Sequence, residues 1–280
     1  MSWLANFTLF NFAVAFYFFL AGAVLALAAL TLGMRDRWLM RVAYAAIATG
    51  ALALTVLIAY RWTAGGHPPL SGVFDAVIFF SWTTVVAFAV AEIAFRTRWL
   101  TLLVGATEVI FLAYASDCDA SIRPLMPVLK SAWLTIHVFA YMIGYGVMTV
   151  AFWTALCHYA YHFRQGDSEP TQRFDRLTYR FIAVGFPLLT AGVLTGAVWA
   201  KRTWGSYWNW DPKETWSLIT WIIYAAFLHL RLWSRTWPIP PARRSTILNW
   251  LAILGFAAIV FTFLLLKYLP SAEQSQHVYL

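Results

Sequence analysis

The sequence is poor in charge. Only 11% of its 280 residues are charged, whereas 61% are hydrophobic. A soluble domain carries roughly a quarter charged residues, so this composition excludes a protein that is surrounded by water on all sides. Acidic residues are the scarcer kind, with 12 against 20 basic residues and a net charge of +8. Because the chain offers no folded soluble domain, this basic excess does not indicate nucleic-acid binding.

Cysteine is also scarce. The two cysteines, Cys118 and Cys157, lie far apart and form no CxxC pair. This spacing excludes a disulfide framework and gives no sign of thiol redox chemistry. The sequence has no internal repeat, no low-complexity tract and no linker long enough to separate domains. We therefore predict a single integral-membrane domain over residues 1–280.

Long apolar runs dominate the chain. Runs of about 20 residues match the length of an α-helix that crosses the hydrocarbon core of a bilayer. Because lipid cannot satisfy backbone polar groups, we expect these runs to be helices with internal hydrogen bonds. The first run has no basic region before it and is too long for a cleaved signal peptide. We predict an all-α, polytopic membrane helical bundle with about eight transmembrane helices, at residues 4–32, 38–60, 72–95, 99–116, 131–160, 178–200, 215–233 and 246–268.

The basic residues are unevenly divided between the two sides of these spans. Thirteen lie on the side that includes the 163–177 loop, and seven lie on the side that includes the 201–214 loop. The positive-inside rule assigns the richer side to the cytoplasm. We therefore predict a protein of the inner (cytoplasmic) membrane whose termini and 201–214 loop face the outer, periplasmic side.

Histidines are the first candidates for chemistry, because an ionisable side chain within a membrane is by default a functional hypothesis. His67, His137 and His277 fall at or beyond span ends on the predicted outer side. His229 lies 13 residues after Trp216, roughly 20 Å further along a helix, and so in the inner half of the membrane. Imidazole is the commonest metal ligand in proteins.

Three other ionisable residues give weaker signals. His158 and His162 are spaced i, i+4 and share a helix face, but no glutamate completes an HExxH pattern. We expect both histidines to reach the interface at the inner end of their span. Glu108 falls near the middle of the 99–116 span and needs a polar partner there.

The segment WGSYWNWDPKETW, residues 204–216, contains four tryptophans, one tyrosine and three charged residues. Taken singly, each tryptophan is typical of an interfacial aromatic belt. Taken together, indole rings that can stack on a flat macrocycle and histidines that can ligate iron indicate a haem site. Its propionates would pair with Lys201, Arg202 or Lys213.

The same segment carries a resemblance to a known family. Residues 204–211 match the tryptophan-rich WWD motif, WGxxWxWD, of the haem-handling cytochrome c assembly family. The continuation PKETW, residues 212–216, resembles the CcsA branch of that family, also called ResC, of the System II pathway. The resemblance extends over nearly the whole chain. It includes GHPPLS after the second span, a histidine that opens the fifth span and a histidine within the seventh.

The resemblance implies a function in c-type cytochrome biogenesis. Members of the family move haem to the outer face and present it to apocytochrome c, whose CxxCH cysteines form thioethers with the haem vinyl groups. By this resemblance the cofactor is haem b. The chain would form part of a holocytochrome c synthase with the membrane protein CcsB, also called ResB.

The resemblance also implies roles for particular residues. His137 and His277 match the two external axial ligands of the haem iron. His229 matches a ligand nearer the cytoplasm, whose companion histidine belongs to CcsB. The haem-binding loop would be formed by Trp204, Trp208, Trp210 and Asp211. We expect Asp211 and Glu214 to orient that loop through hydrogen bonds.

Two alternatives belong to different functional classes. A CcmC-like exporter would hand haem to a chaperone without making thioethers, and the PKETW continuation disfavours it. A b-type electron-transfer subunit would hold a permanent haem between paired histidines inside one bundle. Most histidines of this chain instead lie at or near one predicted face.

Overall fold

The computed structural model describes residues 2–32, 37–70, 72–233 and 239–268. Within these ranges the chain consists of helices joined by turns, with no strand, which confirms the predicted all-α fold. Contacts between helices divide the chain into two compact units. Unit 1 ends at Lys130 and unit 2 begins at Ser131, and each is described by itself.

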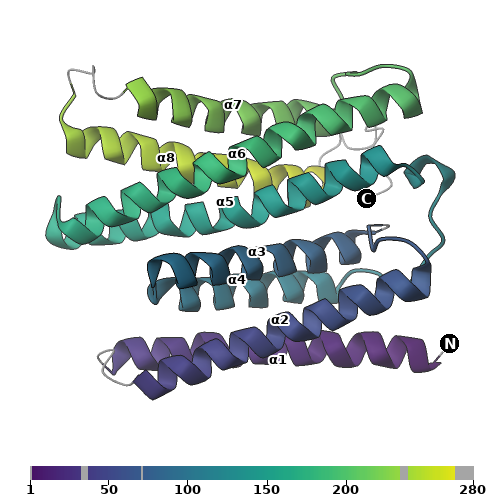
Figure 1. Ribbon diagram of the computed structural model, residues 1–280, viewed down its shortest axis with the longest axis horizontal. Helices are drawn as coiled ribbons and strands as arrows, with labels where there is room; N and C mark the ends of the chain where they lie inside the picture. The colour runs from purple at the N-terminus through teal and green to yellow at the C-terminus, as the bar shows by residue number, and fades with distance from the viewer. Residues whose placement is uncertain (1, 33–36, 71, 234–238, 269–280) are drawn as a thin grey trace. The chain divides into compact units, whose positions relative to one another are not determined.

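Unit 1 contains four helices. They are α1 (Ser2–Thr31), α2 (Arg37–Gly65), α3 (Val73–Phe95) and α4 (Trp99–Ser116), followed by the 3₁₀ turn η1 (Pro127–Leu129). Helix α1 packs against α2 and α4, and α3 packs against α4 and α2 (Figure 1). Each helix is apolar along most of its length. The buried side chains of this unit are therefore mostly apolar and include both small and large residues.

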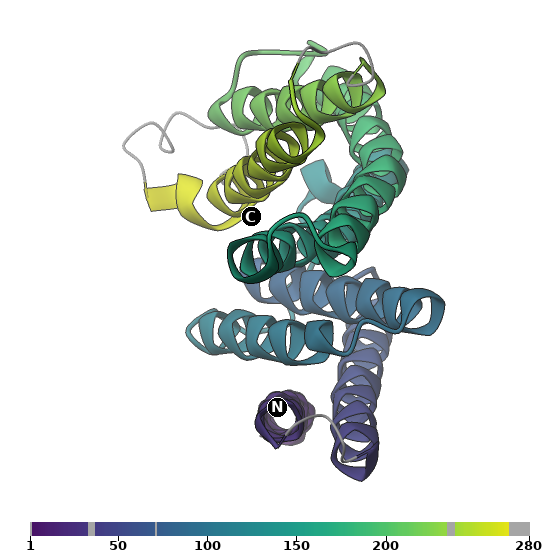
Figure 2. The same cartoon turned by 90° about the vertical axis from the view of Figure 1, so that its left-hand side faces the viewer.

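Unit 2 contains the four remaining helices. They are α5 (Ala132–Gln165), α6 (Glu169–Trp204), α7 (Pro212–Trp233) and α8 (Pro241–Val260). A π-helical turn η3 (Phe261–Leu265) and a 3₁₀ turn η4 (Leu266–Tyr268) continue α8. Helices α5 and α6 form the most extensive pair, and α8 packs against α5, α6 and α7. Figure 2 views these helices nearly along their axes. Helices α5 and α7 begin, and α6 ends, at the same end of the unit.

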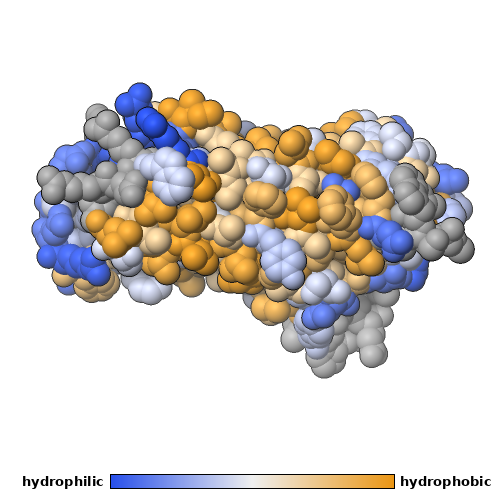
Figure 3. All heavy atoms as spheres, turned by 90° about the horizontal axis from the view of Figure 1, so that it is seen from below, coloured by the Kyte–Doolittle hydropathy of each residue, from blue (hydrophilic) through white to orange (hydrophobic). Residues whose placement is uncertain are grey.

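Among the described residues, seven helices are long and apolar enough to cross a membrane. The expected eighth span, α4, forms an apolar helix, but its Leu100–Ser116 portion is shorter than the other seven. Hydrophobic side chains cover the middle of the face shown in Figure 3, with hydrophilic ones toward its ends. The chain is therefore a multi-pass membrane protein. Its helices can lie in lipid because each satisfies its own backbone N–H and carbonyl groups.

The helices of unit 2 extend beyond the predicted spans. The run expected at 178–200 belongs to a 36-residue helix, α6, which starts after Ser168 and continues through Pro187. Hydropathy marks only the part of a helix that lipid would cover, whereas backbone hydrogen bonds continue into polar sequence. Segment 169–177, expected as part of an inner loop, is consequently the first part of α6.

A buried ion pair organises the α2–α3 connection of unit 1. Arg61 Nε lies 2.5 Å from Asp75 Oδ1, and both side chains are almost completely buried. The Arg61 guanidinium also donates to the carbonyl oxygen of Ala120, at 2.7 Å, and lies over the Phe74 ring. One arginine therefore ties α2 to α3 and to the segment after α4.

Candidate functional site

The tryptophan-rich loop, residues 205–211, joins α6 to α7. Gly205 ends α6 in the left-handed conformation, with φ of 82°, which glycine adopts without a Cβ penalty. Its N–H donates to the carbonyl oxygen of Lys201 at 3.1 Å. The Lys201 ammonium donates back to the Gly205 carbonyl oxygen at 2.7 Å. The start of the loop is therefore fixed by bonds within four residues.

The end of the loop is fixed by a reciprocal cap on α7. The N–H of Lys213 donates to Asp211 Oδ1 at 2.8 Å. Glu214 Oε2 accepts from the N–H of Asp211, at 3.2 Å, and from the N–H of Asn209, at 2.7 Å. Asp-Pro-Lys-Glu thus forms a capping box with proline at the first helical position. Asp211 and Glu214 are both buried, and they make the orienting hydrogen bonds that we expected.

Between these two fixed ends the loop presents aromatic rings. Tyr207 and Trp210 are 58% and 69% exposed, and Trp210 has a positive φ of 56°. The rings of Trp208 and Trp210 meet edge to face, with centroids 5.9 Å apart. The indole N–H of Trp208 is buried without a hydrogen-bond partner among the described residues. Exposed ring faces beside an unsatisfied donor fit a flat ligand that carries an acceptor at its edge.

His137 lies on α5 against α6, at the loop end of unit 2. Its Nδ1 lies 2.7 Å from the carbonyl oxygen of Gly192. A carbonyl only accepts, so Nδ1 carries the proton and Nε2 carries the lone pair, the state in which an imidazole can serve as a metal ligand. The His137 ring stacks at 6.4 Å on Trp199, which in turn meets Trp204 edge to face at 4.7 Å. The structure therefore links His137 to the start of the loop through two indoles.

His229 lies near the other end of unit 2. It is 17 residues after Pro212, which places it roughly 25 Å along α7. Its Nδ1 donates to the carbonyl oxygen of Ala225 at 2.8 Å, and its side chain is exposed. Ile222 and Leu232 lie on the same face of α7 and are also exposed. The histidine thus presents a lone-pair nitrogen outward from the unit.

The remaining histidines have other surroundings. His277 lies outside the described residues. His67, in unit 1, places its ring nitrogens 2.9 Å from the Pro68 carbonyl oxygen and 3.1 Å from that of Arg123. His158 is 2% exposed, so the expectation that it reaches the interface is wrong. It packs between α5 and α6, where its Nδ1 donates to the carbonyl oxygen of Thr171 at 3.1 Å.

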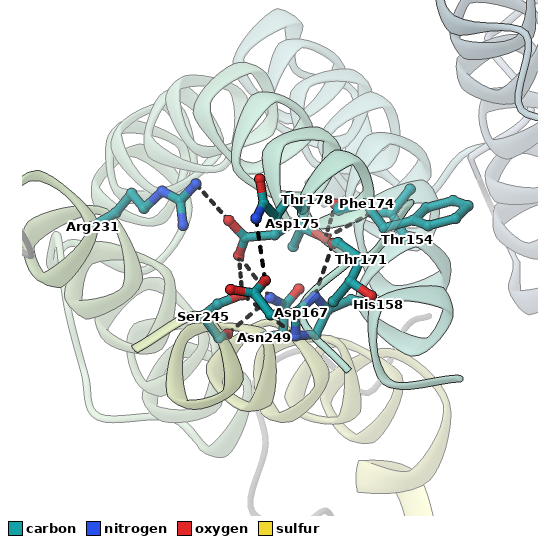
Figure 4. A network of polar contacts seen from close by, with 11 residues as sticks. Thr154, His158, Asp167, Thr171, Phe174, Asp175, Thr178, Arg231, Ser245 and Asn249 are labelled. Atoms are coloured by element: carbon teal, nitrogen blue, oxygen red, sulfur yellow. Dashed lines mark hydrogen bonds and ion pairs between the residues drawn. The ribbon is translucent and has the colours of Figure 1, made fainter. Parts of the chain in front are cut away.

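Sequence reasoning missed a polar network between α6, α7 and α8 (Figure 4). The Asp175 carboxylate has three partners. Arg231 Nη2 forms an ion pair with it at 2.7 Å, and Ser245 Oγ and Asn249 Nδ2 each donate a hydrogen bond to its Oδ1 at 2.9 Å. Asp175 fell in a segment expected as loop, and Asn249 is a lone polar residue in an apolar run. Both residues face inward, as their positions along their helices require. A correct start for α6 in the sequence analysis would have revealed this inward position.

Comparisons with known proteins agree with this architecture. The family model described as "Cytochrome C assembly protein" matches residues 70–272. The chain therefore belongs to the cytochrome c assembly protein family, and its multi-pass helical fold makes it a membrane protein of that family.

Within the family the chain is similar to CcsA proteins. It is 36% identical to "Cytochrome c biogenesis protein CcsA" of Synechococcus sp. (strain CC9311), over 68% of this chain and 75% of that protein. It is 34% identical to the CcsA of Chlamydomonas reinhardtii, over 73% of this chain and 62% of that protein. The chain thus has a role in the biogenesis of c-type cytochromes, in a family that handles haem.

A solved structure shares the fold. "Cytochrome c Heme Lyase CcmF" superimposes with a TM-score of 0.71 at 20% identity, covering 93% of this chain and 47% of that one. The chain spans about half the length of CcmF. At this identity the likeness concerns the fold alone.

Proposed function

We propose that this chain binds haem b at the 205–211 loop and presents it for covalent attachment to apocytochrome c. The observation that carries the proposal is the coupling of His137 to the loop. Its Nε2 lone pair is set by the 2.7 Å bond to Gly192, and its ring is joined to Trp204 through Trp199. A metal-ligating imidazole whose other nitrogen is fixed by a carbonyl is the arrangement that proteins use to orient such ligands.

Different residues at the loop would contact different parts of the haem. The exposed rings of Tyr207 and Trp210 offer faces for the porphyrin, and the buried Trp208 N–H offers a donor to a propionate. His137 supplies one axial ligand and His277 the other. Asp211 acts through its cap on α7, because a carboxylate facing a propionate would repel it.

His229 marks a second haem position that this chain does not complete by itself. Its exposed ring on α7 is consistent with a companion histidine from another protein, for which we propose CcsB. Haem would load beside His229 and then reach the loop, which we place on the outer face of the cytoplasmic membrane. The loop and His229 are separated by much of a membrane thickness, so the two positions should respond separately to substitution.

Three substitutions test the function and its order. His137→Ala and His277→Ala should abolish covalent haem on a co-expressed apocytochrome c while haem stays at the His229 position. His229→Ala should deplete haem at both positions, because haem would no longer load at the first position and so could not reach the loop. His162→Ala, which removes an imidazole from the far end of α5, is the matched control and should behave as wild type.

Bound haem in the purified protein and covalent haem in the cytochrome are measured for each variant. Complete haem loss in His137→Ala together with normal haem in His229→Ala would reverse the proposed direction. Normal haem attachment in His137→Ala would contradict the proposed haem site at the loop.

A further inference from the structure

A cavity of about 350 Å³ lies at the end of unit 2 opposite the tryptophan-rich loop. Three arginines line it, each from a different helix: Arg176 from α6, Arg231 from α7 and Arg244 from α8. Its volume is within the range of small-molecule pockets in proteins. Guanidinium groups that converge from three helices are a typical arrangement for recognising an oxyanion.

The carboxylates of the cavity leave this positive character in place. Asp175 is engaged by Arg231, Ser245 and Asn249, so its two oxygens already accept three hydrogen bonds. Asp167 is the other carboxylate of the lining and accepts from Gln172 at 3.4 Å. The lining therefore carries three arginines and two aspartates, and Arg231 is paired with Asp175. Arg176 also pairs with Glu169 outside the lining, at 3.6 Å, but both side chains are exposed and such a pair is weak.

Backbone groups add to the attraction for an anion. Helices α6 and α8 both begin at this end of the unit, and neither has a side-chain hydrogen bond at its N-cap. The first turn of a helix presents N–H donors and the positive end of the helix dipole. Gln172 and Arg244 are the fourth residues of these helices and line the cavity, so the cavity lies beside the first turns of both.

The cavity is separate from the haem position at His229. Residues 229 and 231 project about 200° apart around the axis of α7. Arg231 turns inward to Asp175, as Figure 4 shows, whereas His229 is exposed on the outside of the unit. A haem held by His229 would therefore lie on the opposite face of α7 from the cavity, so its propionates do not account for the arginines.

We propose that this cavity binds a phosphate group. The phosphate belongs either to the headgroup of an anionic membrane lipid or to free inorganic phosphate. The cavity lies where α6 and α8 begin and α7 ends, which is the level of lipid headgroups for helices that cross a bilayer. One charge-assisted hydrogen bond from each of Arg176 and Arg244 would hold a phosphate oxygen, while Arg244 Nε stays bonded to the carbonyl oxygen of Ile239. The first turns of α6 and α8 would stabilise the remaining charge.

The test uses the full chain in a neutral detergent and follows its thermal unfolding. Dioctanoyl phosphatidylglycerol, dioctanoyl phosphatidylcholine and sodium phosphate are titrated separately, because a ligand that binds the folded state raises the unfolding temperature. Saturable stabilisation by phosphatidylglycerol that phosphatidylcholine does not match assigns the site to an anionic lipid. Equal saturable stabilisation by sodium phosphate assigns it to free phosphate.

Two variants tie the effect to the cavity. Arg176→Gln and Arg244→Gln should each weaken the binding of the effective ligand by about tenfold or more, the cost of one charge-assisted hydrogen bond. Arg176 is largely exposed, so its variant should fold normally. Arg173→Gln removes the same charge from an exposed position of α6 that does not line the cavity, and should bind as wild type.

Two results would overturn the proposal. One is the absence of saturable stabilisation of the wild-type protein by either anionic ligand. The other is an affinity that stays unchanged in Arg176→Gln. Neither result depends on haem, so the proposed function is tested independently.

Discussion

The ring of His137 lies in a notch on α6 that only glycine leaves open. A Cβ on Gly196 would lie 2.4 Å from His137 Nδ1 and 2.6 Å from Cε1. Both distances are far below van der Waals contact, so the imidazole would have to leave its position beside the Gly192 carbonyl oxygen. The orientation of a proposed haem ligand thus depends on a missing side chain on the neighbouring helix.

Gly196→Ala should therefore impair the outer haem position without removing any ligand. We expect strong loss of covalent haem attachment, as in His137→Ala, measured as holocytochrome c formed in co-expressing cells. Gly185→Ala is the matched control on the same helix, since its new Cβ would meet the flexible end of Met148. Wild-type attachment in Gly196→Ala would show that the ring position has no part in function.

The cap on α7 separates a structural role of Asp211 from a direct one. Asp211→Ala removes the side chain that accepts the Lys213 N–H and should lower the free energy of unfolding by about 1 kcal/mol. Asparagine is as good an N-cap as aspartate, so Asp211→Asn should keep both stability and haem attachment. Thermal unfolding and holocytochrome yield are measured together. Failure of Asp211→Asn in attachment, with normal stability, would indicate that the charge itself contacts the haem or its acceptor.

The orientation of the chain gives a further prediction. A periplasmic reporter enzyme inserted after Trp204 should be active, and the same reporter inserted in the turn before α6, within 166–168, should be inactive. The physical reason is that 13 of the 20 basic residues lie on the side that includes the 166–168 turn, and the richer side faces the cytoplasm. The opposite pattern of activities would reverse the proposed faces of both haem positions.

The exposed face of α7 should contact the proposed partner. We expect cysteines at Ile222 or Leu232, which flank His229 on that face, to form cross-links with CcsB in membranes. Cys118 and Cys157 are first replaced by alanine. Ala225→Cys is the control, because that position is buried within the unit. Cross-links that form equally at all three positions would mean that the contact is not specific to this face.

The Asp175 network should contribute to stability. Asp175→Asn removes the charge that pairs with Arg231, an interaction whose two side chains are 12% and 22% exposed. Loss of one partner of a buried pair costs about 3–5 kcal/mol, and partial exposure reduces this to about 1–3 kcal/mol. The free energy of unfolding in detergent measures the effect. Glu169→Gln, at the exposed pair with Arg176, should change it by less than about 0.5 kcal/mol.

Hydropathy predicted the helices of this chain well, because an apolar run of membrane length has few alternatives to a helix. It failed at helix ends, where α6 continues for nine residues into polar sequence before residue 178. The tryptophan-rich loop was recognisable because its spacing is unusual, and its Asp-Pro-Lys-Glu cap follows a local rule.

The surroundings of the histidines were less accessible to sequence reasoning. The contact between His137 and Gly192 joins residues 55 positions apart, and no local pattern encodes it. His158 and His162 shared a predicted face, yet His158 alone is almost completely buried. Such differences depend on where the neighbouring helix lies, which a hydrophobic pattern does not specify.

The outward position of His229 has a consequence for how much of this protein a cell can maintain. At the membrane depth that we propose for His229, its exposed imidazole nitrogen would have no water to bond to, which would raise the free energy of the isolated chain. The proposed partner would cover that nitrogen and remove the cost, so we expect the chain without CcsB to be the form more open to proteolysis. Its abundance should then follow the supply of the proposed partner rather than its own rate of synthesis.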